Sequence, residues 1–252
     1  MPPTAYVNYA STITVCGETV GETVARAEGK LFTLNSSPGW KLNREHLITI
    51  GGNEYREWDP RRSKLAAFLA LGGDFFPFAR QSSVLYLGAS AGTTASHVAD
   101  IVPEGRVCCI EISFGSFARL REVAAHHANM IPMLADASRP GEYATAAGEP
   151  DILYQDIAQG NSVDIFLRNA LHFRSLRSVM LVVKARSIDS SASPRSVFEE
   201  ARRSVDEALG VSTGMLDISP FEKDHAVIYA SVGESGGTSH THTGKGPDVP
   251  TL

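Results

Sequence analysis

The stretch from Val84 to Thr94, VLYLGASAGTT, decides the fold of this chain. Four apolar residues lead directly into a turn of Gly, Ala and Ser, and Thr93 and Thr94 then open a predicted helix. A buried parallel strand that stops at small residues lets the backbone approach a ligand closely, and a helix start offers unpaired N–H groups. Such a turn is where open α/β sheets hold cofactors.

Alternating strand and helix patterns continue from Ser83 onward. The predicted strands cover residues 84–87, 107–112, 130–134, 152–154, 179–183, 213–218 and 226–232, and the clearest helices cover residues 117–127, 162–173 and 194–209. This alternation predicts an α/β fold with a mostly parallel sheet covered on both faces. A short connection containing Pro220 joins the last two strands, which indicates a hairpin and one antiparallel strand.

The residues on either side of this pattern read differently. Short β-type runs at residues 12–15, 31–34 and 47–50, broken by glycines and a proline, predict a small antiparallel sheet, and a helix is expected after Pro60 in SKLAAFLALGG. We therefore expect a small N-terminal β domain over residues 1–57, an α/β domain over residues 58–232 and a disordered tail over residues 233–252. His240 and His242 in that tail could hint at metal binding, but we interpret the segment as a solvated low-complexity end.

Composition excludes several classes of protein. The chain has 252 residues and a net charge of −5, so no global basic field is available to hold nucleic acid. Its cysteines, Cys16, Cys108 and Cys109, form neither a disulfide framework nor a zinc spacing, and the adjacent pair is expected on opposite faces of a strand as small core residues. The N-terminus lacks the pattern of a signal peptide, and no apolar run predicts a membrane span, so we expect a soluble intracellular protein.

Acidic residues follow the next two strands. Glu111, near the end of VCCIEIS, can accept hydrogen bonds from both hydroxyls of a ribose. Asp136 follows in MLADAS, where its carboxylate and the Ala137 backbone could meet an adenine edge. Three successive strands thus end in residues typical of a nucleoside-containing cofactor site. The alternative is a tight turn of no special function, because GASAG has the spacing GxxxG and not the dinucleotide GxGxxG.

Polar residues also follow the fourth and fifth strands. Asp156 in DILYQDIAQ should emerge at the same edge of the sheet, with Gln159 close behind, and Lys184 follows five apolar residues. A lysine at a buried strand end is costly to desolvate unless it is paired, so Asp156 is its expected partner, with a purely structural ion pair as the alternative.

Two further residues carry weaker signals. His225, just before the final strand, and Lys64, in DPRRSKLAA, would each ordinarily be structural or solvated residues. Arg61, Arg62 and Lys64 nevertheless form the best local patch for a phosphate.

Five segments together resemble fibrillarin, the methyltransferase of box C/D guide-RNA particles. They are EYREWDPRRSKLAA, VLYLGASAGTTASHVADIV, DILYQDIAQ, VVKARSID and PFEKDHAVIYA, and the resemblance runs from about Glu54 to Val232. It implies an S-adenosylmethionine-dependent methyltransferase that acts on a ribose 2′-hydroxyl of rRNA or tRNA. It implies catalytic roles for Lys64, Asp156, Lys184 and His225. The implied cofactor contacts are Gly88, Ala89, Ser90, Ala91, Gly92, Thr93, Thr94, Glu111, Ile112, Asp136, Ala137, Asp156 and Gln159. No metal is implied.

The resemblance also implies an assembly. Its parts are a Nop-family scaffold protein, a kink-turn-binding ribosomal-type protein, box C/D guide RNA and target RNA, in the cytoplasm of an archaeon or the nucleolus of a eukaryote, with no membrane. The absence of a Gly/Arg-rich N-terminal extension is typical of the archaeal type. Ile112 stands where an aromatic residue is usual, Ala135 replaces a Gly, and RSLRSVM lacks the usual Gly pair. Two alternatives remain. The GxxxG spacing and the Asp156/Lys184 pair argue against an NAD-dependent oxidoreductase. The four implied catalytic residues are all present, which disfavours a non-catalytic scaffold of the same fold, and the changed residues around the adenine site keep that scaffold open.

Overall fold

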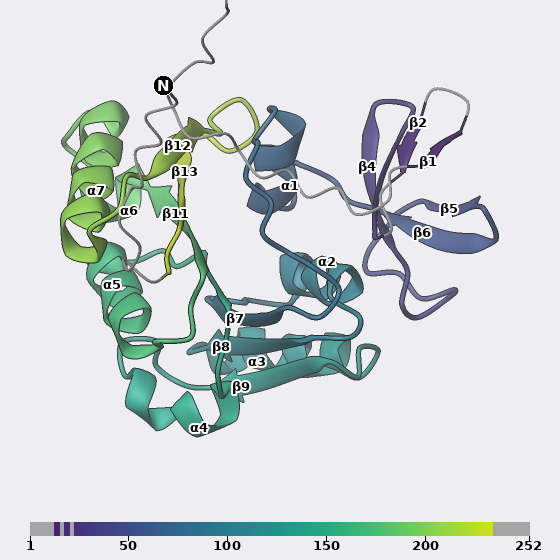
Figure 1. Cartoon of the computed structure of the whole chain (residues 1–252), viewed down its shortest axis with the longest axis horizontal. Coiled ribbons are helices and arrows are strands. Elements are labelled where there is room, and N and C mark those ends of the chain that lie inside the picture. Colours follow the sequence, from purple (N-terminus) through teal and green to yellow (C-terminus); the bar gives the residue numbers. More distant parts are fainter. Residues whose placement is uncertain (1–12, 16–17, 21–22, 234–252) are drawn as a thin grey trace, which may run out of the picture.

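The computed structural model describes residues 13–15, 18–20 and 23–233, which form two sheets (Figure 1). The small sheet is antiparallel throughout, with the strand order β1-β2-β3-β4-β6-β5. Its strands are β1 (Ile13–Val15), β2 (Glu18–Val20), β3 (Val24–Ala27), β4 (Lys30–Leu34), β5 (Leu47–Ile50) and β6 (Asn53–Glu57). The predicted small antiparallel sheet is thus confirmed, whereas Cys16 and the tail with His240 and His242 lie outside the described residues.

The large sheet has seven strands in the order β12-β13-β11-β10-β7-β8-β9. They are β7 (Ser83–Leu87), β8 (Arg106–Glu111), β9 (Met130–Leu134), β10 (Ile152–Gln155), β11 (Ser178–Lys184), β12 (Gly214–Asp217) and β13 (His225–Ser231). β13 pairs antiparallel with both β11 and β12, and the other pairings are parallel. The sheet is therefore mostly parallel with one antiparallel strand, as the alternation predicted.

Helices cover both faces of the large sheet. They are α1 (Lys64–Ala70), α2 (Thr93–Ile101), α3 (Phe114–Ala124), α4 (Ala144–Ala147), α5 (Ser162–His172), α6 (Ala185–Ile188) and α7 (Pro194–Leu209), with a short 3₁₀ turn η1 at Pro140–Glu142. One core cluster lies under α1, α2 and α3, and the other lies under α5 and α7. Cys109 belongs to the first cluster and Cys108 to the second, so adjacent residues of β8 do face opposite sides of the sheet.

One predicted helix lies elsewhere than expected. α3 begins at Phe114 and not at Phe117, because the Ser113 hydroxyl accepts a hydrogen bond from the Ser116 amide and caps the helix there. It also ends at Ala124, which leaves His126 and His127 outside the helix.

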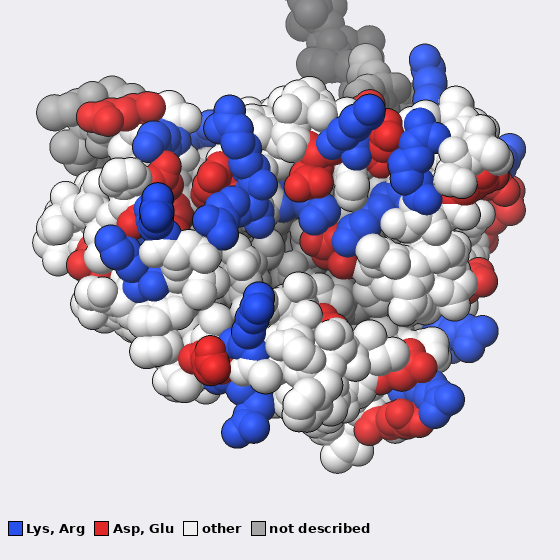
Figure 2. All heavy atoms as spheres, turned by 180° about the vertical axis from the view of Figure 1, so that it is seen from behind, with Lys and Arg blue, Asp and Glu red and all other residues white. Residues whose placement is uncertain are grey.

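The surface carries its charges unevenly. Figure 2 shows the face turned away in Figure 1, where the surface is hollowed near its centre and lysine and arginine side chains lie above the hollow with acidic side chains among them. A net charge of −5 therefore coexists with a local concentration of basic groups. Local basic patches, more than net charge, decide where phosphates bind.

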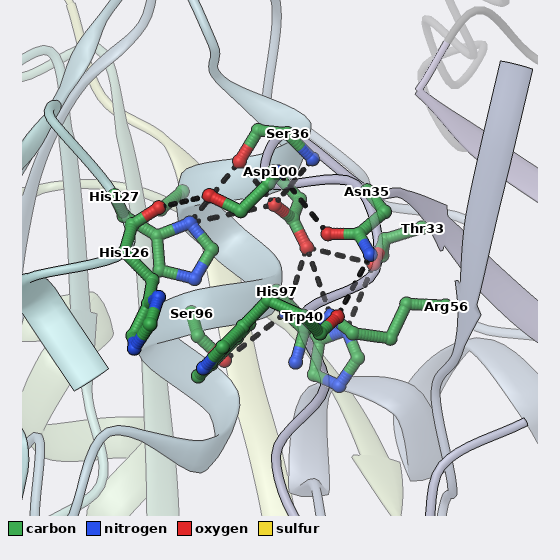
Figure 3. Close-up of polar contacts among 12 residues, drawn as sticks. Thr33, Asn35, Ser36, Trp40, Arg56, Ser96, His97, Asp100, His126 and His127 are labelled. Carbon is green, nitrogen blue, oxygen red and sulfur yellow. Dashed lines mark hydrogen bonds and ion pairs between the residues drawn. The ribbon is translucent and has the colours of Figure 1, made fainter. Parts of the chain in front are cut away.

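Buried polar side chains join the small sheet to α2, which lies beside it (Figure 3). Arg56 of β6 is fully buried, and its guanidinium lies 2.7 Å from Asp100 of α2 and 3.0 Å from Glu45. The Ser36 hydroxyl donates a hydrogen bond of 2.6 Å to the other Asp100 oxygen. Because buried charges are stable only when paired and hydrogen-bonded, this network fixes the docking of the small sheet against α2.

Candidate active site

The large sheet has a point where its strand order reverses, between the neighbouring parallel strands β7 and β10. Ligands of open α/β sheets bind in the crevice outside the carboxyl ends of strands at such a point. Here a cavity of about 280 Å³ opens beside Gly88, which follows β7, and Asp156, which follows β10. It is lined by Gly88, Ser90, Ile110, Glu111, Ile112, Ala135, Asp136, Ala137, Asp156, Ile157, Ala158, Gln159, Ile165 and Lys184.

The turn after β7 depends on glycine at its first position. Gly88 has a φ of +77°, and a Cβ there would lie 2.9 Å from the Asp156 carbonyl oxygen. Any other residue at this position would therefore have a strained backbone, and its Cβ would collide with Asp156, which follows β10. Glycine at this position therefore permits the close approach of the two strand ends beside the cavity.

Glu111 is fixed in the cavity by backbone donors. Its carboxylate accepts hydrogen bonds from the Ser90 amide at 2.8 Å and from the Ser113 amide at 2.7 Å, one on each oxygen. The side chain is 8 % exposed and lines the cavity. Each carboxylate oxygen keeps a free lone pair, so Glu111 can still accept the two vicinal hydroxyls of a ribose.

The segment after β9 also lines the cavity. The Asp136 carboxylate accepts a hydrogen bond from the Ser138 amide at 2.8 Å, and this bond lowers the pKa of Asp136. Ala137 lies buried next to it, and Ile112 lines the cavity while remaining 56 % exposed. A planar ring system would cover this exposed apolar side chain.

Five predicted cofactor residues do not line the cavity. They are Ala89, Ala91, Gly92, Thr93 and Thr94. Ala89 is buried in the core, and Gly92 caps α2 with a φ of +89° against Leu120 and Val123. The Thr94 hydroxyl donates a hydrogen bond of 3.1 Å to the Ser63 hydroxyl. Ala89, Gly92 and Thr94 therefore shape the turn and anchor it in the core.

A second group of predicted residues meets at the rim of the same cavity. Asp156 lies between two lysines, with Lys64 Nζ 3.2 Å from Oδ2 and Lys184 Nζ 2.7 Å from Oδ1. Lys184 also donates a hydrogen bond of 3.1 Å to the Asp156 carbonyl oxygen. The predicted Asp156–Lys184 pair is therefore present, and Lys64 is not a freely solvated residue. Two ammonium groups against one carboxylate leave one positive charge in excess.

His225 begins β13 directly opposite Lys184 in the β11–β13 register. Its Nδ1 lies 2.7 Å from the Lys223 carbonyl oxygen. Because a carbonyl oxygen only accepts, Nδ1 carries the proton, and in the neutral ring Nε2 is left as an acceptor. The starts of α1 and β13 and the ends of β10 and β11 thus bring the four predicted catalytic residues to one edge of the sheet.

Sequence reasoning missed the apolar lining of this cavity. Ile110, Ala135, Ile157, Ala158 and Ile165 all contribute to it. Their only signal is a position at or just after a strand end, which many core residues share. Lys184, expected only as a catalytic residue, lines the cavity as well.

Comparison with known proteins agrees with this geometry. The family model described as Fibrillarin matches residues 19–234. The chain belongs to the fibrillarin family. A fibrillarin-like rRNA/tRNA 2′-O-methyltransferase of Methanopyrus kandleri is 43% identical to it over 203 residues, which are 80% of this chain and 88% of the relative.

Solved fibrillarin structures share the fold. A crystal structure of Aeropyrum pernix fibrillarin in complex with natively bound S-adenosyl-L-methionine is similar with a TM-score of 0.72 and 32% identity, covering 87% of this chain and 98% of that one. A fibrillarin/Nop5p complex contains a chain with a TM-score of 0.72 and 37% identity, covering 83% of this chain and 97% of that one. The fold is therefore the Rossmann-like methyltransferase fold with a small N-terminal sheet, and fibrillarin membership removes the oxidoreductase alternative.

Proposed function

We propose that this fibrillarin transfers a methyl group from S-adenosylmethionine to the 2′-hydroxyl of a ribose in rRNA or tRNA. The observation that carries the proposal is the group formed by Lys64, Asp156 and Lys184 at the rim of the cavity that Glu111 lines. The names of the archaeal relatives and the cofactor found in the Aeropyrum pernix structure support it.

The residues present fit a nucleoside cofactor. Glu111 has the lone pairs for a ribose diol, and Ile112 and Asp136 provide an apolar surface and an acceptor for a base. Gly88, which lines the cavity, has no side chain to stand between the backbone and a ligand. Gln159 and the backbone around Asp156 would meet the remaining polar end. S-adenosylmethionine supplies an activated methyl group when bound.

The chain's own residues then prepare the acceptor. A neutral ribose hydroxyl is a poor nucleophile, so it must lose its proton as the new bond forms. Lys184, held by Asp156, orients that hydroxyl and stabilises its oxygen as negative charge grows. Lys64 and His225 position the ribose and its neighbouring phosphates. Alignment of the reacting atoms supplies much of the effect, since orientation alone is worth roughly 7–11 kcal/mol.

Target choice is delegated to RNA pairing in this proposal. A chain with a net charge of −5 neutralises few phosphates overall, so it should bind naked RNA weakly and without sequence preference. Box C/D guide RNA would select the nucleotide, and a Nop-family scaffold and a kink-turn-binding ribosomal-type protein would hold the chain over it. The fibrillarin/Nop5p complex supports the scaffold. In an archaeal cell this assembly would work in the cytoplasm.

Reconstitution tests this function directly. The chain is combined with a Nop-family protein, a kink-turn-binding protein, a guide RNA and radiolabelled cofactor, and methyl incorporation into target RNA is measured. We expect incorporation with a matched guide and none with a guide of scrambled sequence. Tight cofactor binding without any methyl transfer would favour the non-catalytic scaffold instead.

A further inference from the structure

Arg186 joins the segment after Lys184 to the residue before His225. It lies on α6, which begins directly after β11, and its Nε donates a hydrogen bond of 3.0 Å to the Asp224 carboxylate. A backbone hydrogen bond reinforces this contact, because the Ala185 amide donates to the Asp224 carbonyl oxygen at 3.0 Å. Asp224 is thus held by its carboxylate and by its carbonyl oxygen, and both donors follow Lys184 in the chain.

Asp224 has an uncommon backbone conformation. Its φ is +60°, in the left-handed region that residues with a Cβ seldom adopt. Such a conformation persists only where the surrounding structure holds it, and it is found disproportionately at functional sites. The bonds from Arg186 and Ala185 provide that hold. The left-handed turn at Asp224 comes immediately before β13, whose first residue is His225.

The conformation of Asp224 determines where the His225 ring finds its partner. Nδ1 of His225 donates a hydrogen bond of 2.7 Å to the Lys223 carbonyl oxygen. Asp224 is the one residue between that carbonyl group and His225, so its backbone angles set where the oxygen lies relative to the ring. The hydrogen bond at one ring nitrogen fixes the tautomer and the orientation of an imidazole. Here it leaves Nε2 of the neutral ring as an acceptor.

We propose that Arg186 and Asp224 are positioning residues for His225. Their ion pair holds the left-handed turn before β13, and the turn keeps the His225 ring in the tautomer whose Nε2 accepts a hydrogen bond. Because His225 lies opposite Lys184 in the β11–β13 register, the ring is held at the same edge of the sheet as that lysine. The inference rests on the methyltransferase function proposed above, in which His225 helps to position the ribose.

The other contacts of Arg186 require an arginine. Its Nη1 donates to the carbonyl oxygens of Ser190 and Ala192, at 2.9 and 3.4 Å, while Nε holds Asp224. A planar guanidinium reaches these acceptors at the same time, whereas a lysine ammonium is a point charge on a flexible stem. The Arg186 side chain is 51 % exposed, so attraction of RNA phosphates is the competing explanation. The two explanations predict different effects of single substitutions.

Long-range ¹H–¹⁵N NMR of the free chain tests the tautomer directly. Spectra are recorded at about pH 8.5, where histidine side chains are ordinarily neutral, and the His225 signals are assigned by their loss in His225→Gln. We expect the Nδ1–H tautomer in wild type. Arg186→Gln should shift the equilibrium toward the Nε2–H form, which an unconstrained imidazole prefers. Arg202→Gln breaks a comparable ion pair, with Glu199 on α7, and should leave the wild-type tautomer.

Single-turnover methylation by the reconstituted particle separates positioning from attraction of RNA. Arg186→Gln removes a positive charge, whereas Asp224→Gly removes a negative charge and leaves a residue that adopts a positive φ without strain. Positioning predicts that both variants lose rate, by roughly 10-fold, since a misplacement of about 1 Å can cost ~100-fold. The double variant should lose no more than either single variant, because the two residues act as a unit. Arg186→Lys, which keeps the charge, should restore little of the rate.

Two results would overturn the inference. One is an unaltered His225 tautomer in Arg186→Gln. The other is a rate that stays normal or rises in Asp224→Gly; together with a loss in Arg186→Gln and near-normal activity of Arg186→Lys, it would show that Arg186 attracts RNA. The NMR spectrum tests the hold on the ring even where the wild-type particle transfers no methyl group. An inactive wild-type particle would count against the proposed function, whereas an active one that tolerates both substitutions would count against the positioning role alone.

Discussion

At the scale of single residues, the site divides its chemistry between two carboxylates with different neighbours. Glu111 is surrounded by backbone amides and has no cation among its hydrogen-bond partners, which suits a neutral diol. Asp156 is paired with Lys64 and Lys184, which suits a site where negative charge develops. Environment, more than residue type, thus separates cofactor binding from catalysis.

Lys184 is the residue whose loss should most affect the chemical step. Lys184→Ala should lower the methylation rate by ~10²–10⁴, the usual range for a group that stabilises charge or moves a proton in the transition state. Lys64 would still pair with Asp156, so the fold should survive and the cofactor Kd should change little. Single-turnover kinetics and calorimetry measure the two effects, with the exposed Lys41→Ala as control. A normal rate in Lys184→Ala would disprove its role.

Glu111 should control cofactor affinity. Glu111→Gln replaces an acceptor oxygen with an NH₂ group, which cannot accept from the Ser90 or Ser113 amide or from a ribose hydroxyl. Hydrogen bonds to a charged group are worth about 1.5–3 kcal/mol, so the Kd for S-adenosylmethionine should rise roughly 10–100-fold. Calorimetry without RNA checks this, and Glu142→Gln, outside the cavity, provides the control. A Kd within twofold of wild type would mean that Glu111 does not hold the ribose.

At the scale of elements, local signals determined what could be predicted from the sequence. The predicted helix at residues 194–209 matches α7, because Ser193 caps it, Pro194 begins it and Gly210 ends it in the left-handed region. Strand ends placed Asp156 and Lys184 correctly for the same reason: parallel strands finish at one edge. The cap at Ser113, which shifts α3, had no Glu or Gln three residues later to mark it.

Side-chain contacts between elements far apart in the sequence could not be predicted in this way. Arg56 and Asp100 are 44 residues apart, and nothing near either residue indicates the other as a partner. The Ser63–Thr94 hydrogen bond spans 31 residues and has the same character. Such pairs depend on how separate elements dock, which hydrophobic periodicity does not encode.

The buried polar network around Asp100 should make the free energy of unfolding depend on pH. Burial lowers the pKa of His127 to about 4 from an ordinary value of 6.5, although Asp100 opposes the shift. The Ser36 hydroxyl donates its hydrogen bond to Asp100, so its oxygen accepts one from Nδ1–H of His127, and the buried Nε2 of the neutral ring is unprotonated. The unfolded chain takes up this proton below about pH 6.5, whereas the folded chain does so only near pH 4. The stabilising contribution is therefore complete above pH 6.5 and is lost as the pH falls toward 4.

Urea unfolding at pH 7 and pH 5 measures this effect. The free energy of unfolding should fall by about 2 kcal/mol more between these pH values in wild type than in His127→Gln. Burial lowers the pKa of His97 as well, so the variant should retain part of the pH dependence. His172→Gln, an exposed histidine, should behave like wild type. Equal losses in wild type and His127→Gln would show that His127 is not held neutral.

At the scale of the whole molecule, the chain combines an acidic net charge with basic groups around one hollow face. Such a distribution disfavours tight binding to free RNA but permits local contacts to phosphates once RNA is delivered by other components. Among the described residues, no helix is long and apolar enough to cross a membrane. In this proposal the chain carries out the methyl transfer, and the guide RNA in the assembly selects the nucleotide.

The proposed reaction is defined by the atom that accepts the methyl group. The measurement is methyl transfer by the reconstituted particle to two target RNAs that differ only at the guided nucleotide, one with a ribose and one with a 2′-deoxyribose. We predict stoichiometric methylation of the first and none of the second, with mass spectrometry placing the methyl group on the 2′-oxygen. Equal methylation of both targets, or a methyl group on the base, would contradict the claim that Lys64, Asp156 and Lys184 act on a ribose hydroxyl.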